Sequence, residues 1–272
     1  MKRSLNRMFF LTALLFMATH CLFAQNRVLI YTHTGEEGFI HKNIQASVEA
    51  LKKMTKEHHI KADVSDDPAD FTRANLSRYD ALIFSNTNDE ALTSDRQRLA
   101  LVHYMEAGGR FVGIHSATTS EPDWPWFWSM IGGKFVRHPK FQPFDVKVID
   151  PCHPSVSFLG DTWHWEDECY FMNQLNPANR VLLAADLTTV KDDKLKEYPG
   201  DVFGDLFPLA WCRKTQHGRI FYTALGHESE DYSEPKFVRH LWEGIKWVLD
   251  DPGDIDYARA STQNIHRISL EE

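Results

Sequence analysis

The chain has 272 residues, with 38 acidic and 30 basic side chains and a formal net charge of −8. An acidic protein without a block of basic residues is a poor candidate for binding nucleic acid or anionic lipid, so we expect neither partner. Hydrophobic residues make up 43% of the chain, which is enough for a single large α/β domain with a sizeable core.

Residues 1–24 have the organisation of a bacterial export signal, with a basic start, an apolar run over residues 8–17, and small or polar residues up to Ala24. We predict cleavage after Ala24 and a periplasmic or secreted mature protein. A lipoprotein anchor on Cys21 is less favoured, because His20 is not the small residue that lipoprotein processing prefers before the cysteine. The apolar run is shorter than the roughly 20 residues of a membrane span, and no later segment qualifies.

Strands and helices alternate in the first half of the mature chain. Continuous apolar runs predict strands over residues 27–31, 60–64, 79–84 and 110–115, and helical spacing predicts helices over 42–56 and from Ser94 to Gly108. This alternation is typical of a parallel sheet with helices on both faces.

The second half is less regular and begins with a densely aromatic run from Trp124 to Trp128. Further strands are predicted over 144–149, 181–185, 206–212 and 219–224, followed by a closing helix over 235–249. No internal repeat or linker is visible. We therefore assign residues 25–252 to one α/β domain and 253–272 to a polar C-terminal tail.

Polar residues follow the predicted strands at the points where these strands end. His33 or His41 follows the first strand, Asn86 follows the strand over 79–84, His115 follows the next, and His227 follows the last. In a doubly wound sheet the carboxyl ends of the strands face one crevice, so we expect these side chains to lie close together.

A segment rich in tryptophan and acid, residues 162–170, adds Asp167, Glu168 and Tyr170 to these candidates. Imidazole nitrogens together with a carboxylate suit Zn, Mn or Fe, although no HExxH motif is present. Two plainer interpretations stay open: His115 as a buried core histidine, and the aromatic run as packing rather than an exposed platform for sugar rings.

The remaining predictions concern other histidines and the cysteines. We expect surface positions for His58, His59, His153 and His217, and burial of Cys152, Cys169 and Cys212 with one disulfide as the alternative.

Several of these segments resemble the ThuA-like (trehalose utilisation) family. The resemblance rests on residues 113–118, 123–127, 135, 138–139, 208–211 and 218–227, and on the turn from Gly38 to His41, and it covers nearly the whole mature chain. It implies a flavodoxin-like, three-layer sandwich with a mainly parallel sheet, similar to class I glutamine amidotransferases. His115 falls near the position of their cysteine, so a glutaminase reaction through an acyl-enzyme is not expected. Asp167, Glu168 and Tyr170 match the family pattern, whereas Glu166 and Cys169 depart from it.

Members of this family are associated with catabolism of trehalose and related disaccharides, often beside oxidoreductases that make 3-keto sugars. The resemblance therefore implies a small carbohydrate substrate. The leading hypothesis is metal-assisted cleavage of a 3-keto disaccharide or glycoside, by elimination or hydrolysis, because a ketone at C3 makes the C2 proton acidic. The alternatives are a non-catalytic carbohydrate-binding protein and a metal-independent hydrolase.

The leading hypothesis gives each candidate residue a role. The predicted catalytic residues are His115, His227, Glu168 and Asp167; the predicted substrate contacts are Tyr170, Trp124, Trp126, Asn86 and His41; and the predicted ligands of a divalent ion such as Zn or Mn are His115, His227, His138 and Glu168.

Overall fold

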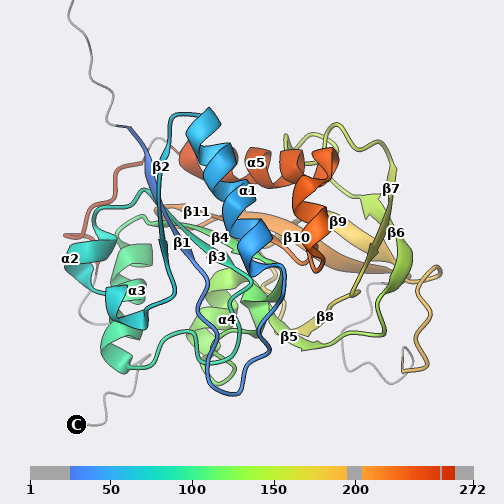
Figure 1. The fold of residues 1–272 in the computed structure, drawn as a ribbon, viewed down its shortest axis with the longest axis horizontal. Helices are drawn as coiled ribbons and strands as arrows, with labels where there is room; N and C mark the ends of the chain where they lie inside the picture. Colours follow the sequence, from blue (N-terminus) through green and yellow to red (C-terminus); the bar gives the residue numbers. More distant parts are fainter. Residues whose placement is uncertain (1–24, 195–203, 252, 261–272) are drawn as a thin grey trace, which may run out of the picture.

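The computed structural model describes residues 25–194, 204–251 and 253–260 (Figure 1). A nine-stranded sheet forms its centre, in the order β2-β1-β3-β4-β11-β10-β9-β6-β7. The predicted export signal lies outside the described residues. Within the described ranges, no helix is both long and apolar enough to cross a lipid bilayer.

Five neighbouring strands of the sheet run parallel to one another. They are β1 (Arg27–Tyr31), β2 (Lys61–Ser65), β3 (Ala81–Ser85), β4 (Arg110–Ile114) and β11 (Arg219–Thr223). Their order, 2-1-3-4 and then the last strand, is that of flavodoxin-like sheets. Every residue of β3 and β4 is buried, which explains the continuous apolar runs in their sequences.

The other four strands are antiparallel to their neighbours, so the sheet is mixed and the prediction of a mainly parallel sheet is wrong. These strands are β6 (Gln142–Val148), β7 (Thr162–Asp167), β9 (Arg180–Asp186) and β10 (Leu206–Lys214). Residues 215–218 alone connect β10 to β11, whereas a parallel pair needs a crossover of about a dozen residues. A separate two-stranded sheet consists of β5 (Lys134–Arg137) and β8 (Phe171–Asn173).

Helices cover both faces of the sheet, as the alternation of elements predicted. They are α1 (Ile44–Glu57), α2 (Arg73–Leu76), α3 (Asp95–Glu106), α4 (Pro125–Ile131) and α5 (Pro235–Leu249), with short 3-10 helices η1 (Pro68–Asp70), η2 (His115–Thr119) and η4 (Ser229–Ser233). Figure 1 shows α1 and α5 on one face and α2, α3 and α4 on the other. Side chains agree with this arrangement, because Phe221 of β11 packs against Gly244 of α5 whereas Tyr222 faces the α4 side with Ile131.

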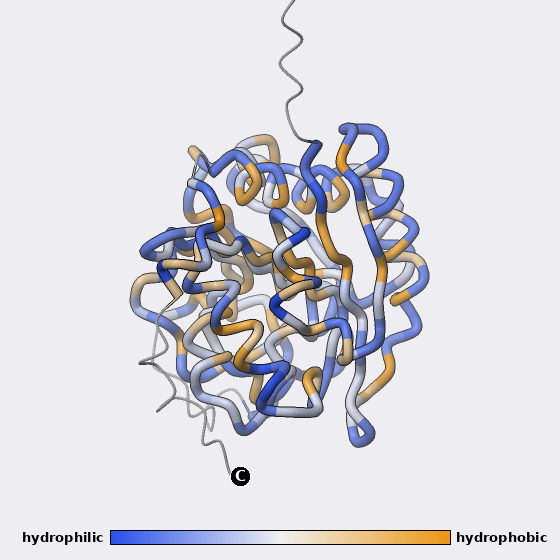
Figure 2. Tube along the Cα trace, turned by 90° about the vertical axis from the view of Figure 1, so that its left-hand side faces the viewer, coloured by the Kyte–Doolittle hydropathy of each residue, from blue (hydrophilic) through white to orange (hydrophobic). Residues whose placement is uncertain are grey.

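The sequence explains where the longer helices begin and end. The Ser94 side chain accepts from the backbone N–H of Gln97 in a capping box at the start of α3, and Gly108 follows that helix with a φ of 106°. Helix α5 has the bounds of the predicted closing helix, and its apolar residues at helical spacing, among them Phe237 and Val248, are buried. Figure 2 shows hydrophobic stretches along the interior strands and hydrophilic residues in the outer loops.

Candidate functional site

His115 lies at a strained turn where β4 ends and the 3-10 helix η2 begins. Its φ is 52°, a left-handed conformation that costs a non-glycine residue roughly 1–2 kcal/mol and is concentrated at functional sites. Tyr222 stabilises the turn by donating from Oη to the His115 carbonyl oxygen (2.8 Å). Gly113 allows the close packing beneath it, because a Cβ there would lie 2.9 Å from the Tyr222 ring. The sequence thus places a fully buried imidazole at a fixed strand end.

The His115 ring is held in a defined tautomer. Its Nδ1 lies 2.8 Å from the carbonyl oxygen of Ala224, which can only accept, so Nδ1 carries the proton. The parallel register pairs Ile114 with Thr223, and this pairing places Ala224 beside His115. The other nitrogen, Nε2, lies 2.9 Å from Tyr170 Oη and is free to accept.

His227 follows β11 in a turn that buried polar groups hold from below. Gly226 has a φ of 111°, and the carbonyl oxygens of Gly226 and His227 accept from Asn43 Nδ2 at 2.6 and 2.8 Å. Asn86 accepts from the same amide (3.0 Å) and donates to Tyr232 Oη (3.0 Å). Asn86 is fully buried, and its contacts favour a role in positioning this turn over the predicted contact with substrate.

Strand β7 brings the acidic residues to the same edge of the sheet. Each antiparallel step reverses the direction of the strand, so β7 runs in the direction of β11 and its carboxyl end lies at the same edge. The sheet curls toward α5, because Trp165 of β7 contacts Phe237 with ring centroids 5.5 Å apart. Two strands that lie far apart in the sheet order therefore meet at their ends.

Asp167 connects these two strand ends. Its carboxylate accepts from Trp165 Nε1 (2.9 Å), Gly226 N (2.8 Å) and Glu168 N (2.7 Å), and the residue is fully buried. Burial raises the pKa of Asp167 to about 6 against the effect of these donors. Because three N–H groups already occupy the carboxylate, the contacts favour a positioning role over the predicted catalytic role.

Four of the predicted site residues form one group, which we call the histidine–glutamate cluster: His41, His115, Glu168 and His227. One potential ligand atom from each lies within 4.8 Å of all the others. His227 Nδ1 is 3.3 Å from His115 Nε2 and 3.1 Å from Glu168 Oε2, and His115 Nε2 is 3.9 Å from the same oxygen. The structure therefore gathers in one place residues that are up to 186 positions apart in the chain.

Three further candidates surround the histidine–glutamate cluster or lie apart from it. Tyr170 contacts His115 as described above, with its ring tilted against the imidazole at 4.6 Å. His138, a predicted metal ligand, lies outside the four-residue group and pairs through Nε2 with Glu168 Oε1 at 3.4 Å. His33 instead contacts the backbone oxygen of Asp66, so His41 is the histidine of the first loop that belongs to the cluster.

Electrostatics divide the histidine–glutamate cluster into two pairs. Burial lowers the pKa of His41 to about 4 and that of His115 well below its ordinary value, and the nearby imidazoles lower both further. The hydrogen bond with Glu168 raises the pKa of His227. Burial alone raises the pKa of Glu168, but the hydrogen bond from His227 and the charge of His138 outweigh it and hold the pKa low. Two neutral imidazoles thus face a carboxylate–imidazole pair.

The two predicted tryptophan contacts lie apart from the histidine–glutamate cluster. Trp124 is only 8% exposed and stacks on Trp126 with centroids 4.9 Å apart, so the exposed aromatic platform considered from the sequence is not formed. Trp126 lines a hollow beside Ile220, which is near the start of β11 and therefore at the sheet edge opposite His227. Aromatic composition alone did not reveal which edge these rings occupy.

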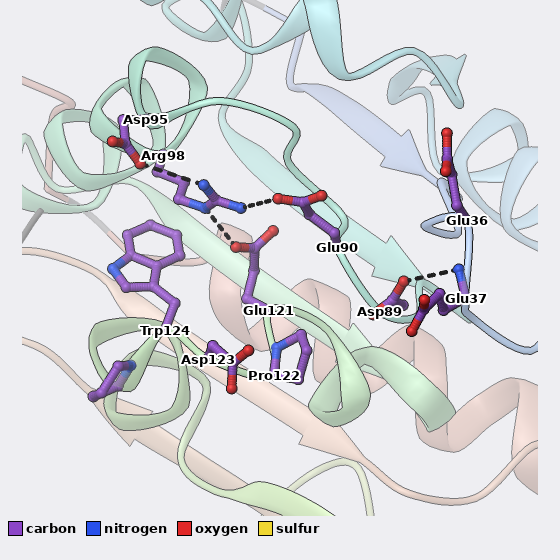
Figure 3. Close-up of a pocket in the computed structure, with 11 residues that line it drawn as sticks. Glu36, Glu37, Asp89, Glu90, Asp95, Arg98, Glu121, Pro122, Asp123 and Trp124 are labelled. Atoms are coloured by element: carbon purple, nitrogen blue, oxygen red, sulfur yellow. Dashed lines mark hydrogen bonds and ion pairs between the residues drawn. The ribbon is translucent and has the colours of Figure 1, made fainter. Parts of the chain in front are cut away.

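Trp124 lines a different, acidic hollow of about 730 Å³ (Figure 3). Arg98 lies among its carboxylates and donates to Glu121 (2.7 Å), Glu90 (2.8 Å) and Asp95 (3.3 Å). These carboxylates are therefore already paired with the Arg98 guanidinium. None of the residues that line this hollow is a histidine. We therefore place the candidate site at the histidine–glutamate cluster.

Sequence reasoning missed the residues that hold the candidate site in place. Asn43 and Tyr232 support the turn before His227, and Tyr222 supports His115. The one available signal was the position of Asn43, two residues after His41 in the same loop. Their polar atoms are turned toward backbone carbonyl groups of the turns that follow β4 and β11, which a linear pattern does not show.

Three minor predictions have mixed outcomes. His58 and His59 are exposed as predicted, but His153 is 1% exposed, so its predicted surface position is wrong. His153 Nδ1 pairs with Ser155 Oγ at 2.8 Å in a packed region under Trp247. Cys169 and Cys212 are buried as predicted, whereas Cys152 is exposed, and all three are free thiols.

Comparisons with known proteins agree with this architecture. A ThuA-like protein from Bacteroides uniformis is 24% identical, with a TM-score of 0.65 over 82% of this chain and 91% of that one. A ThuA-like protein from Parabacteroides merdae is 20% identical, with a TM-score of 0.64 over 83% and 90%. A β-galactosidase from Rahnella sp. R3 is 16% identical, with a TM-score of 0.51 over 82% of this chain and 31% of that one. At these identities the likeness shows the fold alone.

No protein of curated function matches the chain. The family model described as ThuA, trehalose utilisation, matches residues 27–248, which is most of the chain. The strands, the elbow at His115 and the turn before His227 all lie within this range. The chain therefore belongs to the ThuA family, and this membership indicates a role in trehalose utilisation or carbohydrate metabolism.

Proposed function

We propose that the chain is a carbohydrate-utilisation enzyme in which the histidine–glutamate cluster binds a divalent transition-metal ion and promotes cleavage of a 3-keto glycoside. The observation that carries this proposal is the convergence of three imidazole nitrogens and one carboxylate oxygen within 4.8 Å of one another. Metal–ligand bonds of about 2 Å place tetrahedral ligands about 3.3 Å apart. The separations of 3.1, 3.3 and 3.9 Å around Glu168, His115 and His227 are close to that value.

The hydrogen bonds around the histidine–glutamate cluster favour a metal ion. A metal-binding histidine usually donates its second ring N–H to a carbonyl or carboxylate, which fixes the orientation of the ring. His115 does this through Nδ1 to Ala224, and its Nε2 then faces Glu168 and His227. Ligand imidazoles must be neutral, and the lowered pKa values of His41 and His115 meet that requirement at neutral pH.

The proposed reaction is elimination across C1 and C2 of the oxidised sugar. A base removes the C2 proton, a double bond forms between C1 and C2, the C1–O bond breaks, and the leaving alkoxide takes up a proton. A bound divalent ion supplies a Lewis acid that stabilises the enolate oxygen. His138, whose side chain is 36% exposed, is the proposed proton carrier, because its Nε2 contacts Glu168 from the solvent side.

Tyr170 is the proposed substrate-orienting residue. Its hydroxyl lies 2.9 Å from His115 Nε2, and burial raises its pKa well above the ordinary value, so the hydroxyl keeps its proton. When Nε2 is engaged by another partner, this proton becomes available to a sugar oxygen in the same space. A neutral donor at this position suits a keto or hydroxyl oxygen.

Metal content and turnover test the proposal together. We expect about one Zn²⁺ or Mn²⁺ per chain after purification or reconstitution, and turnover of a 3-keto glycoside that a chelator abolishes and the ion restores. His227→Ala should lose the ion and the activity. The matched control is His164→Ala, because His164 is on β7, is 85% exposed and contacts Asp145 rather than the cluster.

Two outcomes would contradict the proposal in different ways. Full activity in the presence of chelator would favour metal-independent hydrolysis, for which the hydrogen-bonded chain from Tyr170 through His115 and His227 to Glu168 is the supporting observation. Sugar binding that is unchanged in His115→Ala, without turnover of any 3-keto sugar by the wild type, would favour a non-catalytic binding protein.

A further inference from the structure

Exposed apolar side chains border the polar histidine–glutamate cluster. Among the described residues, six large hydrophobic side chains are exposed, and three of them lie in the loops beside this cluster: Phe39 (61%), Ile40 (71%) and Phe141 (40%). Phe39 and Ile40 directly precede His41, whereas Phe141 lies between β5 and β6. Exposed hydrophobic side chains beside a group of convergent polar residues are typical of a ligand site.

The two phenyl rings contact different imidazoles of the histidine–glutamate cluster. Phe39 meets His41 edge to face with centroids 4.9 Å apart, and Phe141 meets His227 with centroids 5.8 Å apart. The two imidazoles are themselves 5.6 Å apart. The rings therefore come from two separate loops and flank the same polar group.

We propose that Phe39 and Phe141 bind the leaving group of the substrate and that this leaving group is an aromatic aglycone rather than a second sugar. This inference rests on the proposed function, because it assigns the sugar ring to the histidine–glutamate cluster and the aglycone to Phe39 and Phe141. Phenyl rings offer flat apolar surface without a hydrogen-bond partner, whereas a second sugar carries hydroxyl groups that need such partners. Offset or edge-to-face contacts with an aryl group use the exposed surface of both rings.

Kinetics on paired substrates test the aglycone preference. An aryl group is a better leaving group than a methyl group, so the informative quantity is the ratio of variant to wild type for each substrate. The substrates are the 3-keto derivatives of phenyl glucoside and methyl glucoside. For the phenyl substrate, the double variant Phe39→Ala, Phe141→Ala should have a kcat/KM about tenfold lower than wild type, because its KM is higher. For the methyl substrate, kcat/KM should change little. Ile149→Ala is the matched control, because Ile149 is 42% exposed after β6. Equal losses for both substrates would overturn the proposal.

Binding of unoxidised phenyl glucoside separates this inference from the proposed function. Without a ketone the compound cannot undergo elimination, and its affinity is measured by calorimetry against methyl glucoside. We expect the wild type to bind phenyl glucoside more tightly than methyl glucoside and the double variant to lose that preference. If this result is obtained but no 3-keto glycoside is turned over, the aryl site at Phe39 and Phe141 is supported and the proposed reaction is contradicted. If the double variant keeps the preference for phenyl glucoside, the proposal that Phe39 and Phe141 bind the aryl group is overturned, whatever the kinetics show.

Discussion

The parallel and antiparallel halves of the sheet contribute different groups to the histidine–glutamate cluster. The parallel half contributes His115 and His227 from the ends of β4 and β11, on backbone fixed by buried strands. The antiparallel half contributes Glu168 from the end of β7, and Asp167 ties that end to Gly226. The difference indicates that one half provides the imidazoles and the other provides the charge that complements them.

The largest expected effect comes from removing one member of each half. If both halves form one working unit, His115→Ala and Glu168→Gln should each lower kcat/KM on a 3-keto glycoside by about a thousandfold or more, and the double variant should lose little beyond either single change. A double-variant kinetic cycle measures this. Additive losses would mean that the two residues act independently, and circular dichroism should show that every variant is folded.

Breaking the connection between the halves should reduce stability and activity together. Asp167→Asn leaves one acceptor oxygen where the carboxylate accepts three N–H groups. The amide nitrogen replaces either Oδ2, which accepts from both Gly226 N and Trp165 Nε1, or Oδ1, which accepts from Glu168 N, so a donor faces a donor in both orientations. We expect a loss of about 2–3 kcal/mol in the free energy of unfolding, measured with urea, and a lower kcat. Asp145→Asn, whose partner is the exposed His164, should change the free energy by less than about 1 kcal/mol. Full activity in Asp167→Asn would remove its positioning role.

Sequence patterns predicted the parallel half better than the antiparallel half. The strands over residues 27–31 and 110–115 were predicted from continuous apolar runs that end at turn-forming residues. The structure has the first at those bounds and ends the second one residue earlier, at Ile114. Three of the four antiparallel strands, β6, β9 and β10, were also predicted, whereas β7 was not. Their direction was not predicted, because alternation of apolar residues does not show which neighbour a strand pairs with. The four residues between Lys214 and Arg219 were the available signal for a hairpin.

The site residues show the same limit. His41, His115, Glu168 and His227 follow strands or loops at one sheet edge, and topology is sufficient to bring them together. Asn86 and Asp167 occupy the same edge, yet their side chains turn inward to backbone and side-chain partners. The direction of a side chain depends on the tertiary hydrogen-bond partners available, so residue type and chain position did not distinguish ligands from supports.

Acid should weaken the contact between the halves through two buried histidines outside the site. His240 of α5 pairs through Nδ1 with the Ser155 carbonyl oxygen (2.9 Å), and burial lowers the pKa of His240 and of His153 to about 4. A histidine with a lowered folded pKa stabilises the protein fully above its unfolded pKa of about 6.5, and this stability is lost as the pH falls toward 4. Each of these two histidines should lower the free energy of unfolding by about 2 kcal/mol when the pH falls from 7.5 to 5.

The pH effect is measured as the change in urea unfolding free energy between pH 7.5 and pH 5. His41 and His115 also have lowered pKa values and add to the wild-type change, so the comparison of wild type with His240→Gln isolates the contribution of His240. The variant should show the smaller change with pH, and His164→Gln at an exposed position should match wild type. An unchanged dependence in His240→Gln would contradict the assignment.

The smallest expected effect concerns the parallel half away from the candidate site. Ser94 caps α3 through the backbone N–H of Gln97, and Ser94→Ala should lower the free energy of unfolding by about 1 kcal/mol. Unlike Asp167→Asn, it should leave kcat/KM unchanged, because α3 packs beside the strands and no residue of the helix belongs to the histidine–glutamate cluster. Urea unfolding and kinetics on the same preparation separate the two quantities. If activity fell together with this modest loss of stability, the activity of the histidine–glutamate cluster would depend on the stability of the whole parallel half and not specifically on the Asp167 connection.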